Sequence, residues 1–330
     1  LLRSIFQMGI PVCGKNLFPS NIQGLPTWFT IRVNKDGYIA RRERNDILVA
    51  MNPETAEEDI RKQDPGTIAI YDETLNLNQR RDDLLFYPIP FDKLVKPVCP
   101  EAKLRKLVRN MIYDGVLARL LGIEMAEIER ALKQQFKKKA KAVQLNFDAA
   151  KAGYEFAGES LAKQDLFRVE RMNKTQGKII IDGNSAAAMG SMFAGVTVFS
   201  WYPITPSSSL GEALIEYTKR YRLDPQTKRA TFAIVQAEDE LAAVGMAIGA
   251  GWAGARSMTA TSGPGISLMA EFVGLAYYAE IPIVIFNIQR VGPSTGLPTR
   301  TMQGDILFTA TLSHGDTKHI MLLPCSVEEC

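Results

Sequence analysis

The residues best placed to do chemistry in this chain are three consecutive acids, Glu238, Asp239 and Glu240. They follow the apolar run Thr231 to Gln236, whose β-branched and aromatic residues are typical of a buried strand. A run without charges comes next, Leu241 to Ala255, made mostly of Ala and Gly. A carboxylate that opens a small-residue helix between two strands can exchange a proton with a ligand at that point.

Only one of the three acids has the spacing that places it beside a helix face without side chains. Gly245 and Gly249 lie one helical turn apart and follow Leu241, the neighbour of Glu240, by four and eight residues. Each Gly costs a helix about 1 kcal/mol relative to Ala, so we expect another backbone to approach this face closely. The alternative is that the helix dipole simply favours acidic residues in the first turn. That explanation would apply to Glu238 or Asp239 equally well.

Three further motifs carry polar groups that could meet a ligand. In Tyr202 to Ser208 the hydroxyl of Thr205 is held between Pro203 and Pro206, and Ser207 or Ser208 is the expected helix N-cap. Ile204 lies within the same turn. The alternative is that this stretch is only a strand-to-helix loop.

The stretch Thr261 to Gly265 has the composition of a phosphate cradle at a helix start, which is the second interpretation of this site. It is not a P-loop, because no Gly-Lys-Ser/Thr follows, and no G-x-G-x-x-G follows a strand, so we expect no nicotinamide cofactor.

Arg290 precedes a loop rich in Gly, Pro and Thr, with hydroxyls at Thr295 and Thr299. This combination suits a carboxylate substrate, although a lone Arg at a strand end is often only a salt-bridge partner.

The elements that would position these groups alternate regularly after residue 177. We expect the following order: strand 178–181, helix 185–194, strand 197–201, helix 207–221, strand 231–236, helix 240–254, strand 257–262, helix 266–279 and strand 281–288. Such alternation predicts a doubly wound parallel α/β sheet, and ligands of such sheets bind at the carboxyl ends of the strands. The four motifs all follow expected strands, and their convergence at one sheet edge is stronger evidence for a ligand site than any single motif.

The first half of the chain predicts a smaller α/β domain with a helical tail. Its expected elements are a hairpin over 27–40 that turns at Asp36-Gly37, strands at 46–51 and 67–71, a short helix over 54–63, and helices starting near residues 101, 125 and 146. A strand at 320–323 is also expected near the other end. The basic run 137–141 is expected on the second of the long helices, as a solvated face rather than a docking site. The predicted division is 1–167, a linker at 168–177, and 178–330.

Composition excludes several classes of function. The net charge is only +3 over 330 residues, and the longest uncharged run is shorter than a membrane-spanning helix, so neither nucleic acid nor a membrane is expected as a partner. The four scattered cysteines indicate reduced thiols and a cytoplasmic location. His314 and His319 lack the spacing of a metal site, so no metal site is expected in this chain. Both ends are expected to be cuts within a longer polypeptide.

At these motifs the sequence resembles the alpha subunit of 2-oxoacid:ferredoxin oxidoreductases, and within them the 2-oxoglutarate enzymes. The resemblance rests on YPITPSS, AEDELAAVGMAIGAGWAGARSMTATSGPG and GPSTGLPTRTMQGD. It extends to FPSNIQGLPTWFTIRV and DILVAMN, which are similar to the gamma domain of the family, here fused ahead of the alpha domain.

The resemblance implies a thiamine diphosphate site whose pyrimidine half is built by residues 178–330. Glu240 matches the glutamate beside N1′ of the aminopyrimidine, where a carboxyl favours the tautomer that deprotonates the thiazolium carbon. The residues implied to line the cofactor with it are Pro203, Ile204, Ser262, Gly263 and Gly265. Those implied to hold the substrate are Thr205, Arg290 and Thr299, of which Thr205 and Arg290 are also counted as catalytic.

The resemblance also implies what this chain lacks. The diphosphate motif, its Mg²⁺ and the 4Fe–4S cluster belong in the family to a beta subunit, and a second alpha–beta pair and ferredoxin complete the assembly. The expected reaction is the oxidative decarboxylation of 2-oxoglutarate to succinyl-CoA, or its reverse, with CoA as a substrate. The alternatives are pyruvate or a branched-chain 2-oxoacid as substrate, a non-redox thiamine diphosphate decarboxylase or synthase, and a non-catalytic nucleotide- or CoA-binding subunit.

Overall fold

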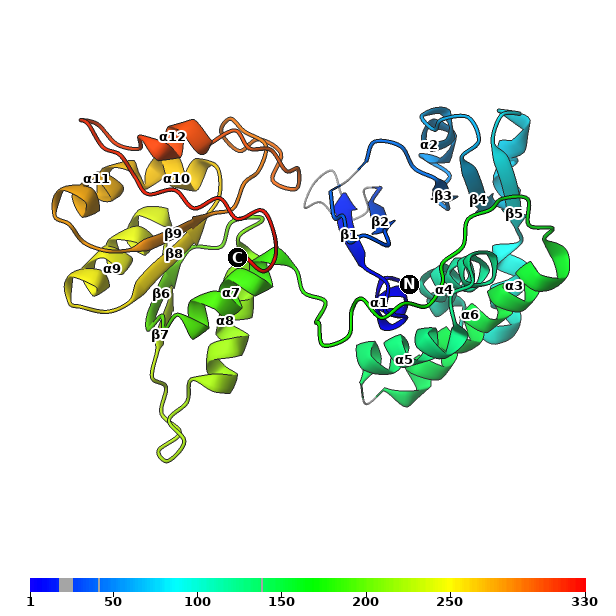
Figure 1. The fold of residues 1–330 in the computed structure, drawn as a ribbon, viewed down its shortest axis with the longest axis horizontal. Coiled ribbons are helices and arrows are strands. Elements are labelled where there is room, and N and C mark those ends of the chain that lie inside the picture. Colours follow the sequence, from blue (N-terminus) through cyan, green and yellow to red (C-terminus); the bar gives the residue numbers. More distant parts are fainter. Residues whose placement is uncertain (18–25, 41, 138) are drawn as a thin grey trace. The chain divides into compact units, whose positions relative to one another are not determined.

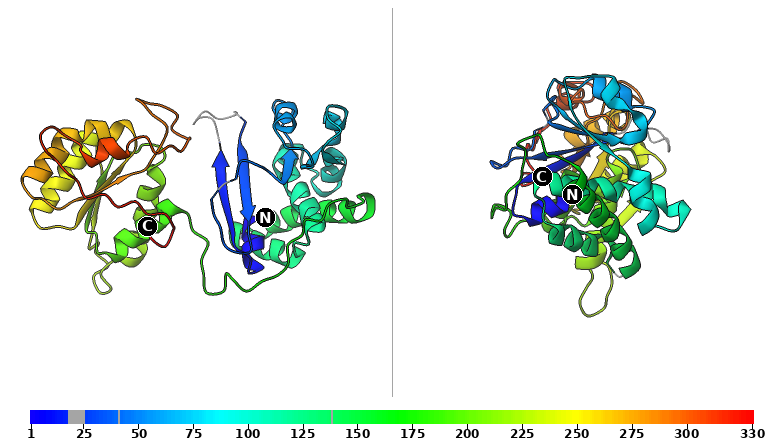
Figure 2. Two further views of the ribbon diagram at one scale, coloured as in Figure 1. Left: turned by 45° about the horizontal axis from the view of Figure 1, so that its top comes forward. Right: turned by 90° about the vertical axis from the view of Figure 1, so that its right-hand side faces the viewer.

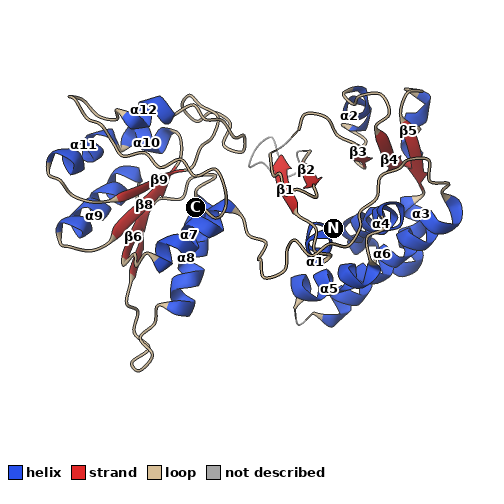
Figure 3. Ribbon diagram, in the orientation of Figure 1, coloured by secondary structure: helices blue, strands red, loops and turns tan. Residues whose placement is uncertain are grey.

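The computed structural model of the chain describes residues 1–17, 26–40, 42–137 and 139–330, and these fall into two compact units (Figures 1 and 3). The first unit comprises Leu1–Asn16 and Trp28–Ile180, and the second comprises Leu17–Thr27 and Ile181–Cys330. The first eight residues of FPSNIQGLPTWFTIRV, at 18–25, lie outside the described residues. The boundaries that we assigned to gamma domain, linker and pyrimidine-binding domain stay predictions.

The first unit is an α/β unit with a helical layer. Its elements in chain order are α1 (Leu2–Gln7), β1 (Val12–Leu17), β2 (Trp28–Val33), β3 (Ile47–Ala50), α2 (Ala56–Arg61), β4 (Ile68–Asp72), the short 3₁₀ turns Glu73–Leu75 and Leu77–Gln79, β5 (Leu85–Ile89), α3 (Phe91–Val98), α4 (Ala102–Leu121), α5 (Met125–Phe136) and α6 (Ala140–Ser160).

The sheet of the first unit has the order β3-β4-β5 with all strands parallel. The central strand β4 is buried at every residue, as expected for a parallel strand that is covered on both faces. Glycines let α4 and α6 pack at backbone distance: a Cβ on Gly115 would lie 1.7 Å from the Ala150 carbonyl oxygen, and one on Gly153 would lie 2.0 Å from that of Ile112. The sheet and this helix pair share one apolar core.

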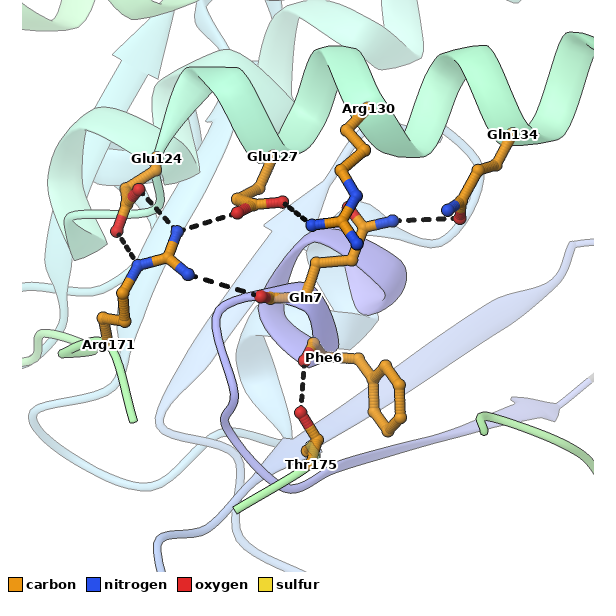
Figure 4. Close-up of polar contacts among 8 residues, drawn as sticks. All are labelled: Phe6, Gln7, Glu124, Glu127, Arg130, Gln134, Arg171 and Thr175. Carbon is orange, nitrogen blue, oxygen red and sulfur yellow. Dashed lines mark hydrogen bonds and ion pairs between the residues drawn. The ribbon is translucent and has the colours of Figure 1, made fainter. Parts of the chain in front are cut away.

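The stretch 168–177, expected to be a linker, runs along the first unit and is held there by polar contacts (Figure 4). Arg171 donates from Nε and Nη2 to both carboxylate oxygens of Glu124, at 2.8 and 2.6 Å, and from Nη2 to Glu127 at 2.8 Å. The Thr175 hydroxyl donates to the carbonyl oxygen of Phe6 at 2.7 Å. We call residues 168–175 the strap.

The second unit has one four-stranded parallel sheet with the order β7-β6-β8-β9. Its elements in chain order are α7 (Gly183–Phe193), β6 (Val198–Trp201), α8 (Ser208–Tyr221), β7 (Ala233–Gln236), α9 (Glu240–Trp252), β8 (Ser257–Thr261), α10 (Pro264–Leu268), α11 (Ala270–Tyr278), β9 (Val284–Asn287) and α12 (Ile306–Ala310). This parallel α/β architecture confirms the expected fold class.

Helices cover both faces of that sheet (Figures 1 and 2). Phe199, Met258 and Ala260 pack with α7 and α8 on one face. Ile285 packs with α9, α10 and α11 on the other. Along β8 the alternation of side chains therefore sends Ser257, Thr259 and Thr261 toward α9. Three layers of this kind are the architecture that the alternation of strands and helices predicted.

Several predicted elements were wrong. Residues 178–181 and 320–323 form no strand, because neither stretch has a strand beside it to complete a hydrogen-bonded ladder. The helix predicted over 266–279 is interrupted at Met269, which ends α10 and precedes α11. Within 27–40 only β2 forms, and it pairs with β1 rather than with the residues after Asp36-Gly37, so the predicted hairpin is wrong.

The basic run also lies elsewhere than predicted. Lys137 ends α5 with a positive φ of 46°, and α6 begins at Ala140 rather than near residue 146. The described part of the run therefore spans the break between two helices instead of lying on one of them.

Candidate functional site

The carboxyl ends of the four parallel strands bring the predicted motifs to one edge of the second unit. β6 and β7 end in register at Trp201 and Gln236, and β8 and β9 end in register at Thr261 and Asn287. The turn 202–207, the acids 238–240, the turn 262–265 and Arg290 follow directly. Ligands of open parallel sheets bind at this edge, so it is the candidate site.

The three consecutive acids have three different environments. Glu238 is exposed to solvent. Asp239 is the N-cap of α9, and its side chain accepts a hydrogen bond from the backbone N–H of Ala242 at 2.7 Å. Glu240 is the first residue of α9 and only 8 % exposed. The purely structural interpretation therefore applies to Asp239, and Glu240 is the acid that is withdrawn from water.

The burial of Glu240 does not depend on the glycine face that we expected. A Cβ on Gly245 would meet only the Phe272 ring, at 3.2 Å, and one on Gly249 would meet nothing within 4 Å among the described residues. The face of α9 that approaches the sheet closely instead carries Ala243, Ala247 and Gly251, all buried. Glu240 lies on this sheet-facing side, three residues before Ala243.

Gly265 makes room for the Glu240 side chain. A Cβ at position 265 would lie 3.0 Å from Cγ of Glu240 and 2.0 Å from Oγ1 of Thr261, so only glycine fits without displacing them. Among the described residues no hydrogen bond or ion pair reaches the Glu240 carboxylate. A carboxylate that is buried without a partner is costly, so this group is poised to pair with the N–H group of a ligand.

The polar groups of the tightly packed turn 262–265 already take part in hydrogen bonds within the protein. Gly263 adopts φ 47° and ψ −110°, a conformation that favours glycine, and Pro264 occupies the first turn of α10. The Ser262 hydroxyl donates to the carbonyl oxygen of Ile288 at 2.5 Å. The N–H groups of Gly265 and Ile266 donate to the carbonyls of Ser262 and Gly263. Because these amides are already engaged, the geometry does not favour the phosphate cradle.

Arg290 is buried to 4 % exposure and links two loops of the site. Its Nη1 donates to the carbonyl oxygen of Thr205 at 2.8 Å, and its Nη2 donates to that of Thr295 at 2.9 Å. Its Nε is buried without a partner among the described residues. Burial lowers the pKa of the guanidinium, while the negative charges of Asp305 and Glu240 act in the opposite direction.

A carboxylate at Arg290 would have to use Nε–H or the hydrogens that remain on the two terminal nitrogens. Gly263 borders the same group, because a Cβ there would lie 3.0 Å from Nε of Arg290. Thr299 is half-buried in the turn that follows Leu297, within a loop closed by backbone bonds between Val291 and Arg300.

The turn after β6 contains a cis peptide bond between Thr205 and Pro206. Pro203 is exposed, and Ile204 and Thr205 are half-buried. Ser207 is the residue before α8, but its hydroxyl donates back to the Ile204 carbonyl at 2.8 Å and makes no N-cap bond. Ser207 therefore occupies the expected N-cap position of α8, but without a capping hydrogen bond from its side chain.

Two residues at this edge, Asn184 and Asp305, were not singled out from the sequence. Asn184 donates to the carbonyl oxygen of Pro206 at 2.9 Å and so ties α7 to the turn after β6. The negative charge of Asp305 acts to raise the pKa of Arg290. The backbone carbonyl of Thr295 accepts a hydrogen bond from Arg290. Thr261 lies beside Gly265. Thr295 and Thr261 both lie in stretches that the sequence analysis had named.

Metal-ligating groups are not gathered in the described parts of the chain: no cluster of three or more His, Cys, Asp or Glu side chains suits an ion there. His314 lies 3.7 Å from Glu271, and His319 contacts the edge of Tyr277. Among the helices of the described residues, none has the length and apolar character to cross a bilayer.

The second unit is a parallel α/β sheet with a buried acid at a helix start, and a family model assigns most of it to a thiamine diphosphate-binding domain. Residues 189–330 match the model described as "Pyruvate flavodoxin/ferredoxin oxidoreductase, thiamine diP-bdg", and residues 1–156 match "Pyruvate ferredoxin/flavodoxin oxidoreductase". The chain belongs to the 2-oxoacid:ferredoxin oxidoreductase family.

Relatives named as subunits of such enzymes support this membership. The chain is 31% identical to "2-oxoacid:ferredoxin oxidoreductase 1, subunit alpha" of Sulfurisphaera tokodaii, over 97% of this chain and 56% of that protein. It is 48% identical to "2-oxoglutarate synthase subunit KorA" of Methanothermobacter thermautotrophicus, over 46% of this chain and 38% of that protein.

A solved structure agrees over nearly the whole chain. It is the 2-oxoglutarate:ferredoxin oxidoreductase from Magnetococcus marinus with 2-oxoglutarate, coenzyme A and succinyl-CoA bound. The TM-score is 0.88 at 31% identity, over 99% of this chain and 55% of that one. The chain thus spans about half the length of the curated relatives that it matches first.

Proposed function

We propose that this chain is the gamma-fused alpha part of a thiamine diphosphate-dependent 2-oxoacid:ferredoxin oxidoreductase. The proposed reaction is the CoA-dependent oxidative decarboxylation of 2-oxoglutarate to succinyl-CoA with ferredoxin as electron carrier, or the reverse carboxylation. The observation that carries the proposal is Glu240, a buried carboxylate that no hydrogen bond from the described residues reaches, at the edge where four parallel strands end. The names of the relatives and the ligands of the solved structure support the choice of substrate.

The residues around Glu240 fit the pyrimidine half of the cofactor. Gly265 gives the Glu240 side chain the room that it occupies, because a Cβ there would lie 3.0 Å from Cγ of Glu240. In our assignment Glu240 pairs with the ring nitrogen and moves a proton there, and Pro203, Ile204, Ser262, Gly263 and Gly265 form the wall against which the ring lies. Bound thiamine diphosphate supplies the electron sink for cleavage of the bond to the carboxylate carbon.

The substrate contacts that we propose lie across the same edge. Thr205 and Arg290 would hold the 1-carboxylate of the 2-oxoacid, and Thr299 would add a hydroxyl contact. The support is that Arg290 is buried beside Gly263. It donates hydrogen bonds to the backbone carbonyls of Thr205 and Thr295, and so links the turn after β6 to the loop that contains Thr299. Positive charge at this position favours a substrate carboxylate over neutral groups.

The rest of the site belongs to other chains in this proposal. A beta subunit would supply the diphosphate-binding motif with Mg²⁺ and the 4Fe–4S cluster, and a second alpha–beta pair and ferredoxin would complete the working enzyme. The names of several relatives as alpha subunits support a partner subunit. We propose a cytoplasmic location, and no nucleic-acid or membrane partner.

Pyruvate is the second candidate substrate, because both matched family models carry its name. Turnover of the purified complex with 2-oxoglutarate, pyruvate and branched 2-oxoacids separates these candidates. The far end of the substrate decides the outcome, since all of them share the 2-oxocarboxylate that Thr205 and Arg290 would hold.

The experiment that tests the function replaces Glu240 in the assembled complex. Glu240→Gln and Glu240→Ala are expected to lower 2-oxoacid turnover by roughly 10²- to 10⁴-fold, the usual contribution of a positioned acid–base group. Glu238→Gln, two residues away and exposed, is the matched control and should keep full turnover. Normal turnover in Glu240→Ala, with the fold intact by circular dichroism, would refute the assignment.

A further inference from the structure

A row of hydroxyls on β8 lies buried under α9. Ser257, Thr259 and Thr261 are 5 %, 0 % and 0 % exposed. Their hydroxyl oxygens have no hydrogen-bond partner among the described residues. On the neighbouring strand β6, by contrast, the hydroxyl of Ser200 donates to the carbonyl oxygen of Ala243 in α9 at 2.6 Å. Buried hydroxyls are nearly always paired in folded proteins, so each of the three unpaired ones requires an explanation.

Thr261 differs from the other two because of its neighbour. A Cβ on Gly265 would lie 2.0 Å from Oγ1 of Thr261 and 3.0 Å from Cγ of Glu240. Because both distances meet at one point, these two atoms are at most 5.0 Å apart, the sum of the two. The carboxylate oxygens lie two bonds beyond Cγ, so rotation about the last side-chain bonds of Glu240 spans this gap without moving either backbone.

The two groups are chemically complementary. A threonine hydroxyl has one hydrogen to donate, and a carboxylate can only accept. Both side chains are buried, and the Thr261 hydroxyl has no hydrogen-bond partner among the described residues. No hydrogen bond from those residues reaches the Glu240 carboxylate, whose charge acts on Arg290 only through space. Pairing them removes the cost of two unsatisfied buried groups at once, and a hydrogen bond to a charged acceptor is the stronger kind.

We propose that Thr261 is the positioning residue of Glu240: its hydroxyl donates to one carboxylate oxygen and leaves the other directed at the bound ligand. Thr261 does not touch the ligand in this role, and it acts through the orientation of the carboxylate. The inference rests on the proposed function of Glu240 and adds to it the group that fixes its rotamer. β-Branching suits this task, since the side chain of Thr261 is stiff at χ1.

The structure offers a matched control for the experiment. Thr259 lies on the same strand and the same face, is equally buried, and also has an unpaired hydroxyl, but it is one pleat further from Glu240. Thr261→Val and Thr259→Val therefore remove the same atom at the same depth. Thr259→Val removes an unpaired buried hydroxyl and is expected to leave the melting temperature of the complex unchanged or slightly raised, whereas Thr261→Val also removes the proposed donor to Glu240 and is expected to lower it slightly.

The variants are to be compared in the complete complex with three readouts. These are the kcat and KM for the 2-oxoacid, the pH profile of kcat, and the dissociation constant of thiamine diphosphate measured by calorimetry on the cofactor-free complex. For Thr261→Val we expect kcat to fall by about 10-fold or more, as for loss of a hydrogen bond to a charged group, with little change in KM. Cofactor affinity should fall as well, and the pH profile should move to higher pH, because a lost donor disfavours the charged carboxylate.

Thr261→Ser keeps the hydroxyl and should restore most of kcat, whereas Thr259→Val should match the wild type in all three readouts. Equal behaviour of Thr261→Val and Thr259→Val would overturn the proposal. If the two differ in melting temperature alone, the hydroxyl is structural and the proposal also fails. Failure of the proposed function is separate, since it would show as normal turnover in Glu240→Ala whatever the Thr261 variants do.

Discussion

The substitution Gly265→Ala tests whether the site depends on the open space beside Glu240. Gly265 lies in the first turn of α10, and its φ is not in the left-handed region, so the backbone itself tolerates alanine. The added methyl would lie 2.0 Å from Oγ1 of Thr261 and 3.0 Å from Cγ of Glu240. Ordinary contacts between such atoms begin near about 3.5 Å, so both side chains must move.

The two consequences of this substitution have different sizes. Overpacking costs about 1–3 kcal/mol, and replacing Gly by Ala within a helix returns up to about 1 kcal/mol. With the full helix return, the net loss of stability is therefore modest, about 0–2 kcal/mol. A carboxylate displaced by about 1 Å from its productive position can cost roughly 100-fold in rate. We thus expect a large loss of turnover with a small loss of stability.

The assay pairs urea unfolding of the purified chain with turnover of the assembled complex. Gly249→Ala is the control, because a Cβ there meets nothing within 4 Å among the described residues and Gly249 lies in the exposed face of α9. That substitution should raise stability by about 0.5–1 kcal/mol through helix propensity. Turnover of Gly265→Ala close to the wild type would refute the reasoning, since it would mean that the carboxylate is not held by this contact.

Two further substitutions test how the elements around the site are held. Asp239→Ala removes the N-cap of α9 and should cost about 1 kcal/mol in urea unfolding, whereas Asp239→Asn should keep most of it. Arg171→Ala should loosen the strap and lower the melting temperature of the first unit near neutral pH. Because Arg171 lowers the pKa of Glu124, this stabilisation is present above the unfolded pKa of Glu124 and is lost as pH falls through its lower folded value. Melting curves of wild type and Arg171→Ala should therefore converge in acid, and a constant difference down to about pH 3 would contradict the ion pair.

The alternating part of the fold was predictable because its signals are local. The four strands from β6 to β9 all form where short runs of strand-forming residues predicted them, and the observed bounds agree to within a few residues. The stretch 178–181 carries the same local signal, yet Ile179 is 66 % exposed and no strand of the described residues pairs with the stretch. A strand forms only where a neighbouring strand accepts its hydrogen bonds. The β-propensity of four residues does not indicate whether such a neighbour exists.

The strap shows the same limit for polar segments. Its lack of periodicity was sufficient to exclude a helix or strand over residues 168–177. It did not reveal that Arg171 pairs with Glu124 and Glu127, 47 and 44 residues earlier in the chain. A hydrogen bond between distant residues depends on how the chain folds back, and a single sequence contains no measure of that distance.

The choice of Glu240 among three acids shows how a spacing argument can select a residue for the wrong physical cause. The glycines at 245 and 249 were expected to admit a backbone, but no backbone of the described residues approaches either of them. Glu240 is buried because it lies on the same side of α9 as Ala243 and Ala247, which pack on the sheet, and because Gly265 has no side chain in the space that Glu240 occupies.

The two explanations for the position of Glu240 predict different effects of substitution. If the exposed glycines set the position of the acid, the site would depend on the outer face of α9. Since the sheet side sets it, the orientation of the carboxylate is determined by β8 and α10, and substitutions at Thr261 and Gly265 should disturb it more than any on the outer face.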